Sequence, residues 1–217
     1  MKVYDPLITR NFDVGFSHLE SQGILQFFPW VGCDYEKSRL AIISKWHYFT
    51  DPAVKDSDRE YTRRIVSSEG IGKNQDPYKE VLSLLFSPAK LTLDDRRRFW
   101  AQCAFFNMGK KQEAQGRPRI LASADFNAFH EIAGVILPTH CLFVGVSLSE
   151  CSTQTELGKL GITVTLSKTF YENNMEIEIA TLSKGSWSAV AAFTKYRHDE
   201  QKPLSTDHLR NYMPKFF

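Results

Sequence analysis

Short apolar runs recur along the chain, and they predict buried strands. Each run is too short for a helix and rich in β-branched or aromatic residues, which favours a strand. The last run alternates apolar and acidic residues and predicts a half-exposed edge strand. The predicted strands cover residues 39–43, 101–107, 141–146, 162–166 and 175–180.

The segments between these runs show the periodicity of amphipathic helices. The clearest case is 123–137, where Phe126, Phe129 and Ala133 fall on one face and Pro138 closes the segment. A capping-box pattern of Thr92 with Asp95 predicts a second helix over 93–100. Weaker signals predict helices at 78–86, 149–159, 188–196 and 206–212, and 51–76 reads as a long loop or lid with a helix at 59–66.

Strands that alternate with helices of this length need crossover connections, which favour a parallel sheet covered on both faces. The sequence therefore predicts the α/β class and a single domain over 1–217, a three-layer α/β/α fold with a central, mainly parallel sheet of four or five strands. In such sheets, ligands bind outside the carboxyl ends of the strands. Candidate site residues are therefore expected at 44–50, 107–111, 145–149 and 181–187.

Composition narrows the class of protein. The 217 residues are 42% hydrophobic and 24% charged, as in a compact domain, and no uncharged apolar run is long enough for a membrane-spanning helix. The N-terminus lacks the apolar core of a signal peptide, so we expect a cytoplasmic protein with no membrane partner. A net charge of +2 permits nucleic-acid binding without favouring it. No pair of cysteines has zinc-site spacing, and Cys103 and Cys141 are expected to be buried as small apolar residues.

Four strand-end segments, in order, resemble the uracil-DNA glycosylase superfamily. The resemblance is to the branch in which a Pro-Trp-Val-Gly segment precedes a first strand ending in Gly-Glu-Ser-His-Tyr, and it covers roughly residues 22 to 190. The order and spacing of the segments carry it more than any single motif does. The matching segments are Pro29-Trp30-Val31-Gly32 with 42–48, then 103–107 followed by Arg117-Pro118, then 140–147, and then 179–187.

This resemblance implies a DNA-binding hydrolase of DNA repair that excises a modified or damaged base by cleaving its N-glycosidic bond. An enzyme of this type flips the base out of the stack, holds it against aromatic rings and reads its edge by hydrogen bonds. Asn107 would read the base with its amide, although a turn residue at a strand end explains it equally well. The implied substrate-binding residues are Ser44, Trp46, Tyr48, Phe49, Asn107, Thr181 and Ser183, and the implied DNA-phosphate contacts are Lys184, Gly185 and Ser186.

The chain departs from the family pattern where catalysis is expected. Lys45 stands at the usual acidic position and Thr181 at the usual histidine, so Asp51 becomes the candidate carboxylate. His47 could donate to the departing base or to a phosphate, or be a structural residue bonded to a loop carbonyl. The catalytic candidates are therefore Lys45, His47 and Asp51, and Arg63, Arg64, Lys110 and Lys111 are further candidate phosphate contacts.

Three interpretations of the family resemblance remain open. The chain is a glycosylase whose base lies elsewhere, a glycosylase/lyase in which Lys45 attacks C1′, or an inactive DNA-binding or protein-interaction module. A rival is an unrelated α/β hydrolase or nucleotide binder, although the G-x-S-x-G, GxGxxG and P-loop signatures are all missing from the sequence. No cofactor is expected, because the cysteines lack iron–sulfur spacing. The sequence leaves the oligomeric state open.

Overall fold

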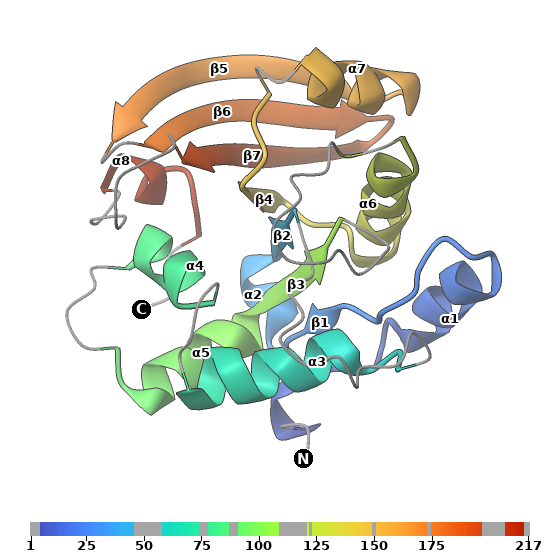
Figure 1. Ribbon diagram of the computed structural model, residues 1–217, viewed down its shortest axis with the longest axis vertical. Coiled ribbons are helices and arrows are strands. Elements are labelled where there is room, and N and C mark those ends of the chain that lie inside the picture. Colours follow the sequence, from blue (N-terminus) through green and yellow to red (C-terminus); the bar gives the residue numbers. More distant parts are fainter. Residues whose placement is uncertain are drawn as a thin grey trace.

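A seven-stranded mixed sheet runs through the computed structural model (Figure 1), in the order β1-β3-β2-β4-β7-β6-β5. The structure describes residues 5–45, 58–73, 78–86, 91–108, 121, 123–148, 151–172, 175–196 and 207–214. The predicted α/β class is confirmed. The strands are β1 (Trp30–Val31), β2 (Leu40–Ser44), β3 (Cys103–Asn107), β4 (His140–Val144), β5 (Thr163–Glu172), β6 (Met175–Lys184) and β7 (Trp187–Tyr196).

Only the middle of this sheet is parallel. β3, β2, β4 and β7 run in one direction, whereas β1 is antiparallel to β3 and the β7-β6-β5 portion is antiparallel throughout. The expectation of a mainly parallel sheet of four or five strands is therefore wrong. The physical reason is that the β5–β6 and β6–β7 connections are too short to hold a crossover helix, so each must form a hairpin.

Two predictions at the C-terminal end of the chain are corrected. The segment 188–196, predicted as a helix, belongs to β7. Its residues alternate between the two faces of the sheet as in a strand, because Ala189, Ala191 and Phe193 pack in one apolar cluster and Ala192 packs in the other. The predicted edge strand at 175–180 belongs to β6, which lies inside the sheet, and the edge is β5.

Most of the predicted helices are present. They include α4 (Tyr78–Leu85), α5 (Leu93–Gln102), α6 (Ser123–Ile136) and α7 (Cys151–Lys159), and the capping box of α5 forms because the Asp95 N–H donates to Thr92 Oγ1 at 3.1 Å. None of the helices in the described ranges is both long and apolar enough to cross a membrane. The remaining helical segments are η1 (Asp5–Leu7), α1 (Asp13–Ser21), α2 (Tyr35–Ser38), α3 (Tyr61–Ile65), the π-helix η2 (Val66–Lys73) and α8 (Asp207–Arg210).

Helices pack against both faces of the sheet and form two apolar clusters. One cluster joins α1, α6 and α7 to the sheet and contains the stacked pair Phe143 and Phe193, with ring centroids 4.3 Å apart. The other joins η2, α4, α5 and α8 to the opposite face. Figure 1 shows α6 and α4 on opposite sides of β2 and β4. Cys103 and Cys141 are buried as predicted, and burial raises the pKa of the Cys141 thiol.

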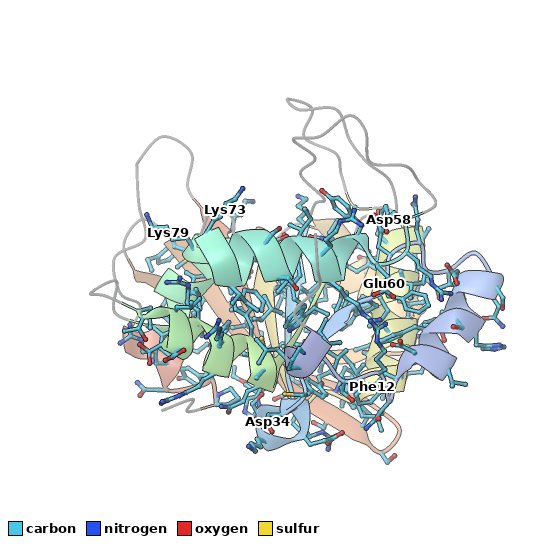
Figure 2. All side chains as sticks on the ribbon, turned by 90° about the horizontal axis from the view of Figure 1, so that it is seen from below. Phe12, Asp34, Asp58, Glu60, Lys73 and Lys79 are labelled. Atoms are coloured by element: carbon cyan, nitrogen blue, oxygen red, sulfur yellow. The ribbon has the colours of Figure 1, made fainter. Side chains whose placement is uncertain are left out.

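Arg63, a candidate phosphate contact, lies instead inside an ion-pair cluster between α3 and α1. Its side chain is 0% exposed, and it donates from Nη1 to Asp13 Oδ2 and to Glu60 Oε1, each at 3.1 Å. Its Nε donates to the Pro29 carbonyl at 2.9 Å. Figure 2 looks onto this side of the molecule and labels Glu60 at the start of α3. The guanidinium of Arg63 is therefore unable to reach DNA in this structure, while Lys110 and Lys111 lie outside the described residues.

Candidate functional site at the carboxyl edge of the parallel strands

β3, β2 and β4 end at the same level, beside Thr194 of β7, and we call this level the carboxyl edge. Register pairing aligns Asn107 of β3 with Ser44 of β2, Ser44 with Val144 of β4, and Val144 with Thr194 of β7. Because residues aligned across a sheet point to the same face, these four side chains form one row. The row lies where open α/β sheets bind ligands.

Backbone hydrogen bonds continue one residue beyond this row. The residue that follows each of β3, β2 and β4 donates its N–H to a carbonyl of the neighbouring strand at this level, so the chain segments leaving the sheet are held in place. The bonds run from Met108 to Ser44 (2.9 Å), from Lys45 to Val144 (3.3 Å) and from Gly145 to Thr194 (2.9 Å).

The structure brings three of the predicted site residues together at the carboxyl edge. Ser44 is buried at 7% exposure, and Lys45 and Asn107 are half-buried beside it. Neighbouring strands lie about 4.8 Å apart, so the Asn107 amide and the Ser44 hydroxyl start from adjacent positions. Asn107 and Ser44 thus place an amide and a hydroxyl on one face of the sheet, and Lys45, the next residue after Ser44, starts on the other face beside Gly145.

The aromatic and acidic candidates lie outside the described residues. These are Trp46, His47, Tyr48, Phe49 and Asp51. Their predicted roles in stacking, polar contact and catalysis therefore stay predictions.

Five other predicted residues lie at the opposite edge of the sheet, by which we mean the ends at which the parallel strands begin. Thr181 aligns with Val190 of β7, and Val190 aligns with His140, the first residue of β4. That level is four residues, or about 13 Å, from the carboxyl edge at a rise of about 3.3 Å per residue. The expectation that one pocket joins Thr181, Ser183, Lys184, Gly185 and Ser186 to Asn107 is therefore wrong, because β6 runs antiparallel to the central strands.

Lys184 also has a local partner at that opposite edge. Its Nζ donates to His130 Nε2 of α6 at 2.8 Å, and Gly185 takes a φ of +58° in the turn that leads into β7. The nearby Trp187 indole donates to the Pro138 carbonyl at 2.9 Å. These contacts hold the β6–β7 hairpin against α6 and against the segment that follows α6.

The end of β7 occupies the place at the carboxyl edge that sequence reasoning assigned to β6. Thr194 is fully buried and its hydroxyl donates to the Phe143 carbonyl at 2.9 Å, while the next residue, Lys195, is half-buried. Sequence reasoning missed both residues, because it interpreted 188–196 as a helix. The continuous apolar run over 189–193, short enough for a buried strand, was the signal that could have found them.

Glu178 of β6 is a buried carboxylate that sequence reasoning also missed. It is 4% exposed, and its Oε2 accepts hydrogen bonds from Ser147 Oγ at 2.9 Å and from the Leu148 N–H at 2.6 Å. Gly145 starts the turn that holds these two donors, with a φ of +75° that favours glycine. Glu178 therefore fixes the chain that leaves β4 against β6.

We expect Glu178→Ala to lower the free energy of unfolding by about 1–3 kcal/mol, because the Leu148 N–H and the Ser147 hydroxyl lose a buried acceptor. The control is Glu176→Ala, which removes a half-buried carboxylate from the same strand and should change the value by about 1 kcal/mol or less. Urea denaturation followed by circular dichroism measures both variants. Equal losses in the two variants would contradict the role given to Glu178.

Within the described residues, no three histidine, cysteine, aspartate or glutamate side chains are grouped as a metal site requires. Comparison with protein-family models, with curated proteins and with solved structures finds no match to this chain.

Proposed function

We propose that the chain is a uracil-DNA-glycosylase-like protein, built as a three-layer α/β/α domain, that binds a flipped DNA base at the carboxyl edge and excises a modified or damaged base. The observation that carries the proposal is the alignment of Asn107 with Ser44 on adjacent parallel strands, with Lys45 beside them. These are the ends of the two strands that carry the first and second family-like segments. An amide next to a hydroxyl at a sheet edge suits recognition of a pyrimidine, whose edge presents both donors and acceptors.

Lys45 supplies the chemistry in this proposal. A neutral lysine amine is a nucleophile that forms Schiff bases with sugar carbon centres. The amine forms a bond to C1′ while the bond from C1′ to the base breaks, and the bonding electron pair leaves with the base. The attached nitrogen then loses a proton to solvent, and the C1′–O4′ bond opens with protonation of O4′, which gives the Schiff base that borohydride reduces. A proton donor then neutralises the base, and His47 is the candidate from the sequence.

A second candidate function is a DNA-binding module without turnover. The observation that favours it is the placement of Thr181 and Ser183 away from the carboxyl edge, which removes two groups that the family resemblance assigned to the substrate. Such a module keeps the base-binding and charged residues but releases no base.

The experiment that tests the proposal incubates the purified chain with labelled single- and double-stranded oligonucleotides. The oligonucleotides carry uracil, hypoxanthine, xanthine or bulky modified pyrimidines, and each reaction is run with and without borohydride. We expect base release and a borohydride-trapped adduct for the wild type, with both lost in Lys45→Ala. Asn107→Ala should weaken base binding or change the preferred base, because it removes the amide.

Ser183→Ala is the matched control, since Ser183 lies at the opposite edge of the sheet, and it should behave like the wild type. Base release without an adduct, retained in Lys45→Ala, would remove the lyase chemistry but keep the glycosylase. Salt-dependent DNA binding without any base release would favour the non-catalytic module. If the chain neither releases a base nor binds DNA, both candidate functions are overturned.

A further inference from the structure

The chain that leaves β4 crosses the sheet on its way to α7. Residues 145–148, which we call the β4 strap, start at Gly145 and extend past β7 to β6, and Figure 1 shows this segment rising from β4 toward α7. Val146 and Ser147 are fully buried. The side chains of Val146 and Leu148 belong to the apolar cluster that joins α1, α6 and α7 to the sheet. The β4 strap is therefore a packed part of the fold and not a loose connection.

The first residue of the β4 strap lies beside Lys45. Gly145 donates its N–H to the Thr194 carbonyl at 2.9 Å, and Lys45 donates its N–H to the Val144 carbonyl at 3.3 Å. A Cβ added at Gly145 would lie 3.9 Å from Lys45 Cβ, so the Lys45 side chain starts against the strap. A displacement of the strap therefore changes the surface beside which this side chain begins.

The far end of the β4 strap is held by the buried carboxylate of Glu178. This residue aligns with Phe193, which precedes Thr194, so it lies next to the level of the carboxyl edge. Its Oε2 accepts hydrogen bonds from Ser147 Oγ at 2.9 Å and from the Leu148 N–H at 2.6 Å. Hydrogen bonds to an ionised acceptor are shorter and stronger than those between neutral groups, so they fix the strap more closely than neutral bonds would.

We propose that Glu178 is a positioning residue for the reaction of Lys45 and acts on it through the β4 strap. This role rests on the proposed function, in which the Lys45 amine attacks C1′. A misplacement of a reacting group by about 1 Å costs about 100-fold in rate, so the amine has to be held in a fixed position. Glu178 holds one end of the strap and the Lys45 side chain starts at the other end. The carboxylate thereby orients the nucleophile without contacting the substrate.

The first measurement compares the kinetics of base release and of the borohydride-trapped adduct in the purified chain and its variants. We expect Glu178→Ala to lower kcat about 10- to 100-fold and to change KM by about twofold or less, because Asn107 and Ser44 still bind the base. Glu178→Gln should recover most of the lost rate, since its side-chain oxygen still accepts from the Leu148 N–H. Gly145→Ala should lower kcat in the same way, because alanine strains the start of the strap at a φ of +75°.

Glu176→Gln is the matched control for these variants. Glu176 lies two residues away on β6 and is half-buried, and its Oε1 accepts from the Tyr171 hydroxyl at 3.4 Å. Its neutralisation removes one carboxylate from the same strand, so it should leave both kcat and KM at the wild-type values. Thermal unfolding of each variant checks that the chain is folded at the assay temperature.

Amide hydrogen exchange followed by NMR tests the link between Glu178 and Lys45 without DNA. We expect Glu178→Ala to speed exchange at the Gly145 and Lys45 N–H groups about tenfold, because a strap that is released at one end opens more often at the other. The Met108 N–H, which donates to the Ser44 carbonyl at 2.9 Å between β3 and β2, is the internal control and should exchange at the wild-type rate.

The outcomes separate the role of Glu178 from the proposed function. If the wild type releases a base but Glu178→Ala leaves kcat or the exchange at Lys45 unchanged, the positioning role is wrong and the proposed function stands. Equal losses of kcat in Glu178→Gln and Glu178→Ala would assign the effect to the charge and overturn the positioning role. If the wild type releases no base and forms no adduct, the proposed function fails and the positioning role fails with it, even where exchange at Lys45 responds to Glu178→Ala.

Discussion

Replacing Arg63 by alanine is expected to lower the free energy of unfolding by about 3–5 kcal/mol. The guanidinium is fully buried and binds Asp13 of α1, Glu60 at the start of α3, and the Pro29 carbonyl before β1. It also lies over the Phe28 ring, 5.3 Å from the centroid. Its removal leaves the two partly buried carboxylates with the exposed Arg10 as their remaining cation, 3.4 Å from Asp13 Oδ2 and 3.3 Å from Glu60 Oε1. It also breaks the contact that joins α1, β1 and α3.

The neighbouring arginine provides the control for this prediction. Arg64 is 31% exposed and forms an ion pair with Asp58, so Arg64→Ala should cost about 1 kcal/mol or less. Urea denaturation measures both variants. The double variant Arg63→Ala/Asp13→Ala should lose less than the sum of the two single variants, because the partners interact directly. A loss in Arg63→Ala no larger than in Arg64→Ala would contradict the structural role of Arg63.

Local signals were sufficient to predict several elements from the sequence. The capping box of Thr92 with Asp95 places the start of α5, and the periodic face of Phe126, Phe129 and Ala133 predicts α6. The apolar runs of β2, β3 and β4 are buried strands as expected. In these cases the residues that decide the structure lie within a few positions of one another.

The elements that were not predicted correctly from the sequence depend on pairing between strands that are far apart in the chain. The alanines of β7 favour a helix in isolation, but in the structure they pair with β4 on one side and β6 on the other. Once β7 is the fourth parallel strand, β6 must run in the opposite direction. This reversal carries Thr181 and Ser183 to the opposite edge of the sheet.

Strand direction also explains which residues of the candidate site were predicted from the sequence and which were missed. Ser44, Lys45 and Asn107 follow apolar runs whose direction was predicted correctly, so the sequence placed them together. Lys195 could not be identified without the direction of β7. Glu178 could not be recognised as buried while its strand was interpreted as an edge strand, because only the presence of β5 beyond it shows that it lies inside the sheet.

Gly32→Ala is expected to destabilise the fold by about 3 kcal/mol or more, beyond the usual range for adding one methyl group to a packed core. A Cβ at this position would lie 2.2 Å from the Ala101 carbonyl oxygen and 2.4 Å from the Trp100 carbonyl oxygen. Both atoms are backbone at the end of α5, so no side chain can rotate away. The Gly32 N–H also donates to the Cys103 carbonyl at 3.0 Å, which fixes the glycine against the start of β3.

This close approach gives a physical reason for the glycine of the Pro-Trp-Val-Gly segment. Only a residue without a side chain lets the chain after β1 lie directly on the last turn of α5, where the Trp30 indole also donates to the Trp100 carbonyl at 2.8 Å. The matched control is Gly134→Ala in α6, where an added Cβ meets nothing within 4 Å. Since alanine is the better helix former, Gly134→Ala should raise stability by about 0.5–1 kcal/mol. Thermal and urea denaturation of the two variants should therefore give changes of opposite sign, and a neutral Gly32→Ala would show that β1 does not pack on α5 in this way.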